Sequence, residues 1–134
     1  MSLFINLPVS NLPAATTFYT DIGFTQNMHF SDENASGLSF HDKFYVMLLS
    51  HDFVKTFLPE GKTIADSHHV TEVLNAIQLE SKEAVDDFLS TVITAGGKEI
   101  KQYDHGFMYG HDFEDLDGHI WEIFWMDPTH IPTN

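Results

Sequence analysis

Two stretches of the sequence, LPVSNLPAATTFYTDIGF at residues 7–24 and IQLESKEAVDDFLSTVITAGG at residues 77–97, follow the same pattern. In each stretch an apolar run is followed by a polar residue that can cap a helix, then by an amphipathic segment, and finally by glycine. A pattern that recurs along one chain indicates a structural repeat. The sequence therefore predicts two related modules that each begin with a strand and a helix.

Three more strands are predicted after each helix, because short apolar or alternating runs between polar residues are typical of strands. The predicted strands are residues 3–9, 24–30, 37–40 and 44–50 in the first half, and residues 73–79, 98–103, 107–113 and 119–126 in the second. The helices are predicted between Asn11 and Gly23 and between Ser81 and Gly96. Both halves thus have the order βαβββ, which predicts an α+β protein.

Residues 51–71 separate the two halves and show little periodicity. Pro59, Gly61 and the polar cluster at residues 66–69 predict an irregular connection. A long irregular segment in a small protein either serves a function or simply tethers the parts that it joins. We therefore predict a single domain over residues 1–134, with module one at about residues 1–52, a linker at about residues 53–71 and module two at about residues 72–127.

The charge of the chain argues against several kinds of partner. Six basic and 20 acidic residues give a formal net charge of −14 at pH 7. This charge repels the phosphates of nucleic acids and the anionic surfaces of membranes. All six basic residues are lysines, so the chain has no arginine to clamp a carboxylate or a phosphate in a bidentate manner. We expect neither a nucleic acid nor a membrane as partner.

The chain contains no cysteine, which excludes thiolate nucleophiles, zinc–thiolate sites and disulfides. This composition fits a reducing compartment. The N-terminal residues MSLFINLPV lack the charged start and the long apolar run of a secretory signal. We therefore predict a cytoplasmic protein.

The segment YDHGFMYGHDFEDLDGHIWEIFWMD, residues 103–127, predicts two aromatic-rich strands joined by a tight turn at Asp117 and Gly118. Within its second strand one carboxylate, Glu122, lies among apolar residues. A strand with apolar side chains on both faces is normally buried on both. A carboxylate in such a strand requires a partner, a proton or a metal, so Glu122 is the first candidate for a functional residue.

These patterns, with LPVSNL and FYTDIGF near the start and FEDLDGHIWEIFW near the end, resemble the vicinal oxygen chelate superfamily. The superfamily includes glyoxalase I, extradiol dioxygenases, fosfomycin-resistance enzymes and bleomycin-binding proteins. The segments EVLNAIQL, GFMYG and FEDLDGHIWE further resemble bacterial proteins called predicted lactoylglutathione lyases. The resemblance covers nearly the whole chain and implies a curled mixed sheet around a shared cavity, and a homodimer.

In this superfamily a divalent metal at the floor of the cavity binds the substrate, with ligands on the first and last strands of each module. The resemblance places these ligands at Phe4, Leu48, Leu74 and Glu122. Only Glu122 carries a group that binds metal, and Asn75, beside Leu74, is a poor ligand for a transition metal. We therefore expect no bound metal and no other cofactor.

His111 is the best candidate for a partner of Glu122, because its predicted strand is adjacent to the strand of Glu122. The alternative is a hairpin whose polar groups bond to each other. Aromatic residues of this hairpin could line a ligand pocket, or they could form core or a dimer interface. The candidate ligand-binding residues are Asn6, Asn75, Tyr109, His111, Trp121 and Phe124.

Three functions remain open. The resemblance implies a glyoxalase-like protein that binds a small molecule, with lyase or isomerase chemistry on a carbonyl compound. In one version a metal polarises the carbonyl, and in another Glu122 is the catalytic base without a metal. The alternative is a protein of the bleomycin-resistance type that binds or sequesters a small molecule without catalysis, which the negative charge and the aromatic residues favour.

Overall fold

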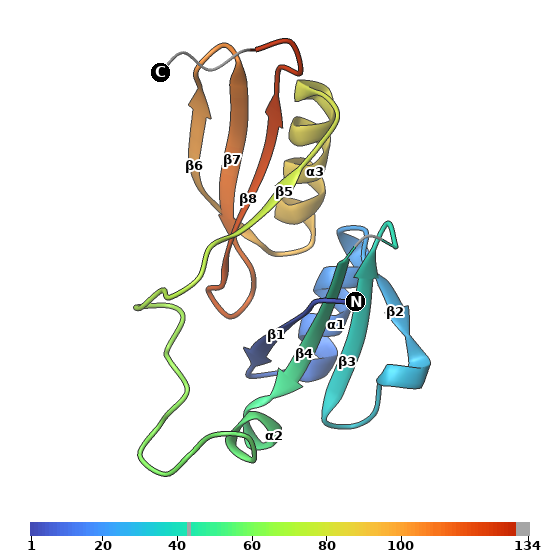
Figure 1. The fold of residues 1–134 in the computed structure, drawn as a ribbon, viewed down its shortest axis with the longest axis vertical. Coiled ribbons are helices and arrows are strands. Elements are labelled where there is room, and N and C mark those ends of the chain that lie inside the picture. The colour runs from blue at the N-terminus through green and yellow to red at the C-terminus, as the bar shows by residue number, and fades with distance from the viewer. Residues whose placement is uncertain (43, 131–134) are drawn as a thin grey trace. The chain divides into compact units, whose positions relative to one another are not determined.

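The computed structural model describes residues 1–42 and 44–130, and these form two compact units that divide between Val70 and Thr71. The first unit contains strand β1 (Phe4–Val9), helix α1 (Leu12–Asp21), strand β2 (Thr25–Asn27), the short 3-10 helix η1 (Met28–Phe30), strands β3 (Ala35–Phe40) and β4 (Phe44–Ser50), and helix α2 (His51–Lys55). The second contains β5 (Asn75–Gln78), α3 (Lys82–Thr94), β6 (Lys98–Asp104), β7 (Met108–Glu114) and β8 (Ile120–Met126). Figure 1 shows the units with their element labels.

The two sheets have the same topology. The strand order is β1-β4-β3-β2 in the first unit and β5-β8-β7-β6 in the second. In each sheet the first strand pairs in parallel with the last one, and the remaining pairs are antiparallel. The prediction of an α+β protein built from two βαβββ modules is thus confirmed.

Local signals in the sequence fix the ends of the long helices. The side chain of Asn11 accepts a hydrogen bond from the backbone N–H of Ala14 at 3.0 Å, and Ser81 caps α3 in the same way through Ala84 at 3.0 Å. Gly23 and Gly96, just beyond the helices, have φ angles of +117° and +103°, which glycine adopts more readily than other residues. The predicted caps and glycine termini are confirmed.

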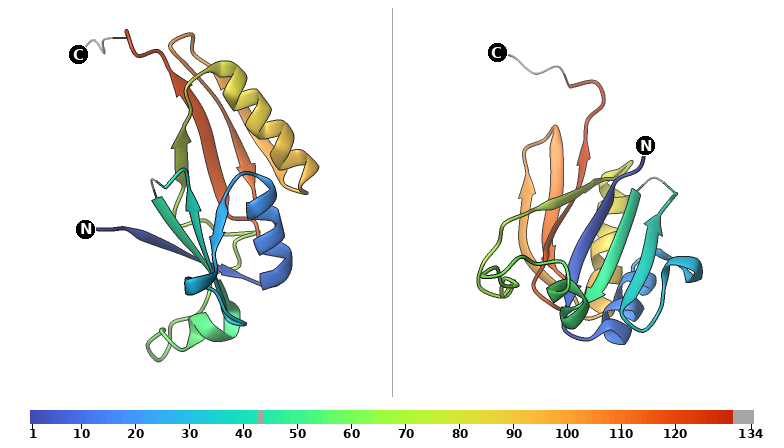
Figure 2. Two further views of the ribbon diagram at one scale, coloured as in Figure 1. Left: turned by 90° about the vertical axis from the view of Figure 1, so that its right-hand side faces the viewer. Right: turned by 60° about the horizontal axis from the view of Figure 1, so that its bottom comes forward.

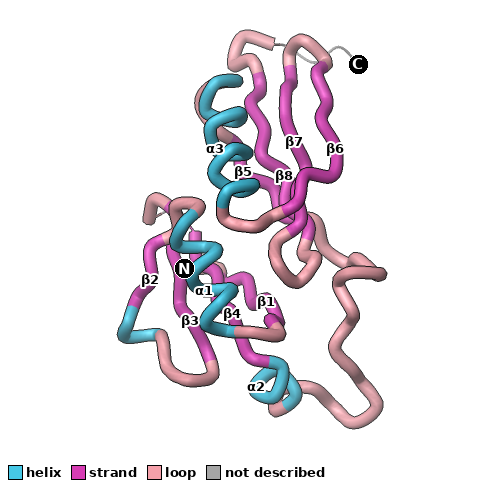
Figure 3. Tube along the Cα trace, turned by 180° about the vertical axis from the view of Figure 1, so that it is seen from behind, coloured by secondary structure: helices cyan, strands magenta, loops and turns pink. Residues whose placement is uncertain are grey.

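Each long helix covers one face of its own sheet (Figures 2 and 3). In the first unit Phe18 and Tyr19 of α1 are buried with Val46 and Leu48 of the sheet. In the second unit Val85 and Val92 of α3 are buried, as are Phe113, Trp121 and Ile123 of the sheet. Burial of these apolar side chains is the main force that holds each helix to its sheet.

Several strand ends shift by one or two residues, as in β5, which begins at Asn75 and not at residue 73. Two predicted elements differ more from the structure. The strand predicted over residues 24–30 ends at Asn27, because the Asn27 side chain accepts a hydrogen bond from the N–H of His29 and starts η1. The irregular connection predicted from residue 51 instead begins with helix α2, since Ser50 caps it through the N–H of Phe53 at 3.3 Å. In both cases a capping side chain, Asn27 or Ser50, starts a short helix that was not predicted.

No helix in the described part of the chain combines the length and the apolar character that a membrane crossing would require.

Candidate functional site

Strand β8 is buried on one face rather than on both. Its residues alternate along the strand, with Trp121 and Ile123 buried and Glu122 and Phe124 half-buried. Alternate residues of a strand point to opposite faces of its sheet, and directly paired residues share a face. We call the face of the second sheet that α3 covers its helix face, and the opposite one its far face.

The helix face carries a network of polar side chains between α3, β6 and β7. The Tyr109 hydroxyl donates a hydrogen bond to Asp86 and lies 3.2 Å from Nε2 of His111. Nδ1 of His111 lies 2.9 Å from Oε1 of Glu99, and its Nε2 lies 3.3 Å from Oδ1 of Asp86. His111 is only 4% exposed. The network thus satisfies both nitrogens of a buried imidazole and links the helix to the sheet.

The same network changes the acidity of Tyr109. Its hydrogen bond to Asp86, together with burial, raises the pKa of Tyr109 to about 12. The ammonium of Lys82 lies 5.7 Å from the centre of the Tyr109 ring and 5.4 Å from that of Trp125. These contacts are cation–π interactions. The polar groups of this network therefore have partners within the unit, which indicates a structural role.

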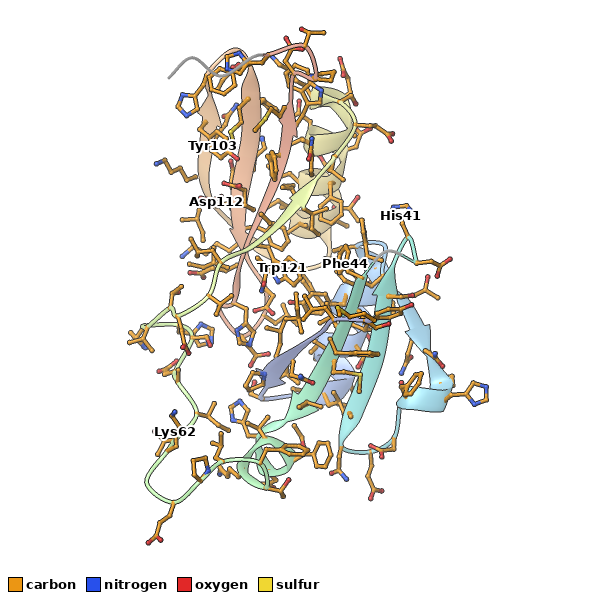
Figure 4. All side chains as sticks on the ribbon, in the orientation of Figure 1. His41, Phe44, Lys62, Tyr103, Asp112 and Trp121 are labelled. Atoms are coloured by element: carbon orange, nitrogen blue, oxygen red, sulfur yellow. The ribbon has the colours of Figure 1, made fainter. Side chains whose placement is uncertain are left out.

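The far face carries a different group, formed by Glu122, Asp112 and Tyr103. Asp112 of β7 pairs directly with Glu122 of β8, so the two carboxylates lie side by side on one face. Tyr103 of β6 pairs with Gly110, two residues before Asp112 on the same face. Figure 4 labels Tyr103 and Asp112 on these neighbouring strands. We call Tyr103, Asp112 and Glu122 the far-face group.

One polar atom of this group, Oδ1 of Asp112, is buried without a hydrogen-bond partner. The hydroxyl of Tyr103 is also buried and interacts with Glu122. Burial, together with this interaction and the charge of the carboxylate, raises the pKa of Tyr103 well above its usual value, so its hydroxyl keeps its proton. Burial also raises the pKa of the Asp112 carboxyl, although the charges of Lys101 and His111 oppose this effect. Buried polar atoms normally have partners, so the unpaired oxygen of Asp112 distinguishes this group from the network on the helix face.

Gly110 makes the position of Tyr103 possible. A Cβ atom at Gly110 would lie 2.7 Å from a ring carbon of Tyr103 and 2.7 Å from the carbonyl oxygen of Ile123. The Tyr103 ring therefore lies across β7 where the strand has no side chain. Gly37 of β3 has the same role in the first unit, where a Cβ would lie 2.6 Å from Cβ of Phe30.

The far face of the first sheet, which is turned away from α1, is aromatic. The rings of Phe4 and Tyr45 stack with centroids 4.9 Å apart, and Phe4 meets Phe30 edge to face at 6.4 Å. Phe4 and Phe30 are 42% and 57% exposed. Asn6 lies on this same face and pairs with Met47. Large exposed aromatic surfaces are typical of binding sites.

The structure divides the predicted ligand-binding residues between different faces. Glu122 and Phe124 share the far face of the second sheet, and Asn6 lies on the far face of the first. Tyr109, His111 and Trp121 lie on the helix face and are buried there, in the row that also contains Asn75.

His111 and Glu122 are therefore not brought together. His111 pairs with Ile123, and its ring contacts Asp86 and Glu99 on the helix face, whereas Glu122 points to the far face. The alternative interpretation, a hairpin whose polar groups hydrogen-bond to each other, holds only in part. His111 lies 3.2 Å from the hydroxyl of Tyr109 on its own strand, but its other partners, Asp86 and Glu99, come from α3 and β6. This result removes His111 as the partner of Glu122.

The helix caps identify the position in the first sheet that corresponds to Glu122. Glu122 on the last strand of the second sheet pairs with Ala76, which lies five residues before the cap Ser81. The residue five positions before the cap Asn11 is Asn6, which pairs with Met47. Of the ligand positions that the sequence predicted, Leu48 lies on the face covered by α1, and Leu74 precedes β5.

The four predicted positions do not fit the divalent metal of the superfamily. Phe4, Leu48 and Leu74 have no donor atom, and neither has Ala76, which pairs with Glu122. Among these residues only Glu122 offers a carboxylate. Within residues 1–42 and 44–130 no cluster of three or more histidines, cysteines or acidic residues could hold a metal ion.

Comparison with known proteins agrees with the fold. Residues 3–123 match the model of the Glyoxalase/Bleomycin resistance protein/Dioxygenase superfamily. The chain belongs to this superfamily. A search of curated proteins found no match.

Solved structures with similar folds come from several bacteria. A hypothetical protein of S. aureus, SA1046, has 24% identity and a TM-score of 0.79, and the match covers 93% of each chain. A glyoxalase/bleomycin resistance protein/dioxygenase family enzyme from Burkholderia phytofirmans has 21% identity and a TM-score of 0.75, with 92% of this chain and 96% of the other covered. The fosfomycin resistance protein FosX of Listeria monocytogenes has 19% identity and a TM-score of 0.69, with 93% and 92% covered. At these identities the likeness concerns the fold.

Proposed function

We propose that this protein binds a small organic molecule on the far face of its second sheet and that it does so without the divalent metal of its superfamily. The observation that carries the proposal is the far-face group, in which Glu122 is accompanied by a buried oxygen of Asp112 that has no hydrogen-bond partner. Unpaired buried polar atoms destabilise a fold unless another molecule satisfies them. A ligand with complementary polar groups would do so.

The aromatic far face of the first sheet is a second, separate surface that could bind an organic molecule. Phe4 and Phe30 offer exposed rings beside the half-buried Tyr45, and such rings can pack against a flat or apolar group. The homodimer and the cytoplasmic location that the sequence indicates stay predictions.

A library of small organic fragments, screened by two-dimensional amide NMR on the uniformly labelled protein, tests the proposal. We expect hits that shift the amide signals of Gly110, Asp112 and Glu122, with saturable titration curves. Signals of α2, which lies apart from these strands in the sequence, serve as the internal control. Hits that shift only signals outside the far face of the second sheet, or a screen without hits, would contradict the proposal.

A second candidate function is isomerisation of a carbonyl compound. This function is favoured because a possible base, Glu122, lies close to a hydrogen-bond donor, the hydroxyl of Tyr103. The two groups are close enough for the Glu122 carboxylate to raise the pKa of Tyr103. Glu122 as base would take the proton next to the carbonyl, and the Tyr103 hydroxyl would donate a hydrogen bond to the oxygen of the resulting enolate. Return of the proton from Glu122 to a neighbouring carbon would complete the reaction. Exchange of substrate hydrogen with deuterated water, absent in Glu122→Gln, tests this chemistry.

A further inference from the structure

His111 is buried on the helix face with a carboxylate beside each of its ring nitrogens. Nδ1 lies 2.9 Å from Oε1 of Glu99 on β6, and Nε2 lies 3.3 Å from Oδ1 of Asp86 on α3. An ionised carboxylate only accepts hydrogen bonds, so each ring nitrogen has to donate one. A histidine ring that donates from both nitrogens is protonated and carries a positive charge.

Tyr109 does not supply a hydrogen to this ring. Its hydroxyl lies 3.2 Å from Nε2 of His111 but donates its hydrogen bond to Asp86. That hydrogen bond, together with burial, raises the pKa of Tyr109 to about 12, so the hydroxyl keeps its proton. A neutral His111 would therefore turn a lone pair toward a carboxylate oxygen in either tautomer. Only the protonated ring satisfies both contacts with the carboxylates.

An irregularity in β6 determines which side chains lie beside the ring. The register of β6 against β7 shifts by one residue between Glu99 and Lys101. Without this shift Lys101 would pair with His111 and share its face. With the shift, Gln102 pairs with His111, and Lys101 pairs with Asp112 on the far face. Such bulges commonly redirect a side chain, and this one keeps an ammonium group away from the ring.

Acidic groups outnumber basic ones around His111. The titratable groups that face the ring or lie next to it are Asp86 and Lys82 of α3, Glu99 and Asp104 of β6, and Tyr109 and Asp112 of β7. The β8 residue that pairs with His111 is the apolar Ile123. Lys82 lies over the Tyr109 ring, whereas both carboxylates contact His111 directly. Burial opposes a charge on the ring, and the two hydrogen bonds to carboxylates offset this effect.

We infer that His111 is a pH-sensitive switch that holds α3 to β6 while its ring is protonated. The protonated ring donates to Asp86 on the helix and to Glu99 on the strand at the same time. After loss of one proton, one carboxylate faces a lone pair, and the contact between helix and strand weakens. The unfolded chain lacks both hydrogen bonds, so the stabilisation by the proton is present at low pH and is lost as the pH rises. The inference concerns the helix face and is independent of the proposed function.

Hydrogen exchange of the α3 amides at pH 6 and pH 8 tests the inference. Histidine ordinarily changes its charge between about pH 5 and 8, whereas carboxylates are generally ionised above about pH 5. Protection factors remove the intrinsic effect of pH on exchange. We expect the protection factors of α3 to fall by about fivefold or more from pH 6 to pH 8 in the wild-type protein. In His111→Gln, whose side chain stays neutral, they should change by less than about twofold.

The matched control is His105→Gln, which removes an exposed histidine of the same unit and should retain the pH dependence of the wild type. Glu99→Gln is a second test variant, should His111→Gln fold poorly. Its amide group can donate to a neutral ring, so it should also reduce the pH dependence. Circular dichroism spectra establish that each variant is folded.

Nitrogen NMR of the histidine rings reports the protonation state directly. We expect both ring nitrogens of His111 to carry a proton at pH 6, and the amide signals of Asp86 and Glu99 to change as the ring loses a proton. Two results would overturn the inference. One is a ring nitrogen of His111 without a proton at pH 6, and the other is a pH dependence of α3 protection that is unchanged in both His111→Gln and Glu99→Gln.

Discussion

Replacement of Trp121 by alanine is expected to lower the free energy of unfolding by about 3–5 kcal/mol. Trp121 is 2% exposed and is among the largest fully buried side chains of the protein. It lies on the helix face of the second sheet, paired with Phe113 and Asn75. Its removal would leave a cavity where close packing now holds α3 to the sheet. Chemical denaturation followed by circular dichroism measures the change.

Trp125→Ala is the matched control, because Trp125 is the other tryptophan and is only half-buried. We expect it to cost clearly less than Trp121→Ala. A second variant distinguishes a role of Trp121 in the core from a role in ligand binding. Trp121→Phe keeps an apolar ring and should retain most of the stability and the binding of far-face ligands. A Trp121→Ala protein as stable as the wild type would contradict the placement of this residue in the core.

Gly110→Ala is expected to destabilise the second unit by about 2–3 kcal/mol, because overpacking of a tight contact forces backbone or side chains to move. The new Cβ would lie 2.7 Å from both a ring carbon of Tyr103 and the carbonyl oxygen of Ile123. The tyrosine could rotate away, but the carbonyl belongs to the neighbouring strand of the sheet. The substitution should therefore also displace Tyr103 and weaken ligand binding at the far face.

Gly61→Ala provides the control for this prediction. Its Cβ would meet no atom within 4 Å, so its cost comes only from its φ angle of +85°, at about 1 kcal/mol. Thermal unfolding and the amide signals of Asp112 and Glu122 compare the two variants. Wild-type stability of Gly110→Ala together with unchanged signals would show that Tyr103 does not lie across Gly110.

The repeated modules could be predicted because their signals are local. Asn11 and Ser81 cap helices through residues three positions away, and Gly23 and Gly96 end them. Such contacts depend on neighbouring residues and are visible in a sequence. The order of the strands could be predicted because each strand is a short apolar or alternating run. The exception is the segment in which Asn27 ends a strand early.

The faces of the hairpin could not be predicted in the same way. Trp121 and Ile123 are apolar, but so are Ile120 and Phe124 on the opposite face, so alternation alone does not show which row is covered by α3. The sequence therefore grouped His111 and Trp121 with Glu122. Only the pairing of β7 with β8 and the contacts of His111 with Asp86 separate them.

Tyr103 and Asp112 were missed for a related reason. Asp112 meets Glu122 through the pairing of β7 with β8, and Tyr103 joins them through the pairing of β6 with β7. A shift of register between Glu99 and Lys101 sets which residues of β6 share the face of Glu122. One signal in the sequence could have indicated them. Asp112 alternates with Gly110, and a glycine within a strand often marks the close approach of another group.

The metal content of the purified protein tests the central claim most directly. The protein is dialysed against nickel, zinc or manganese salts and then against metal-free buffer, and its metal is measured by elemental analysis. Since only Glu122 offers a strong donor among the four family positions, we predict much less than one ion per chain for each metal. About one ion per chain that is lost in Glu122→Ala would contradict the claim.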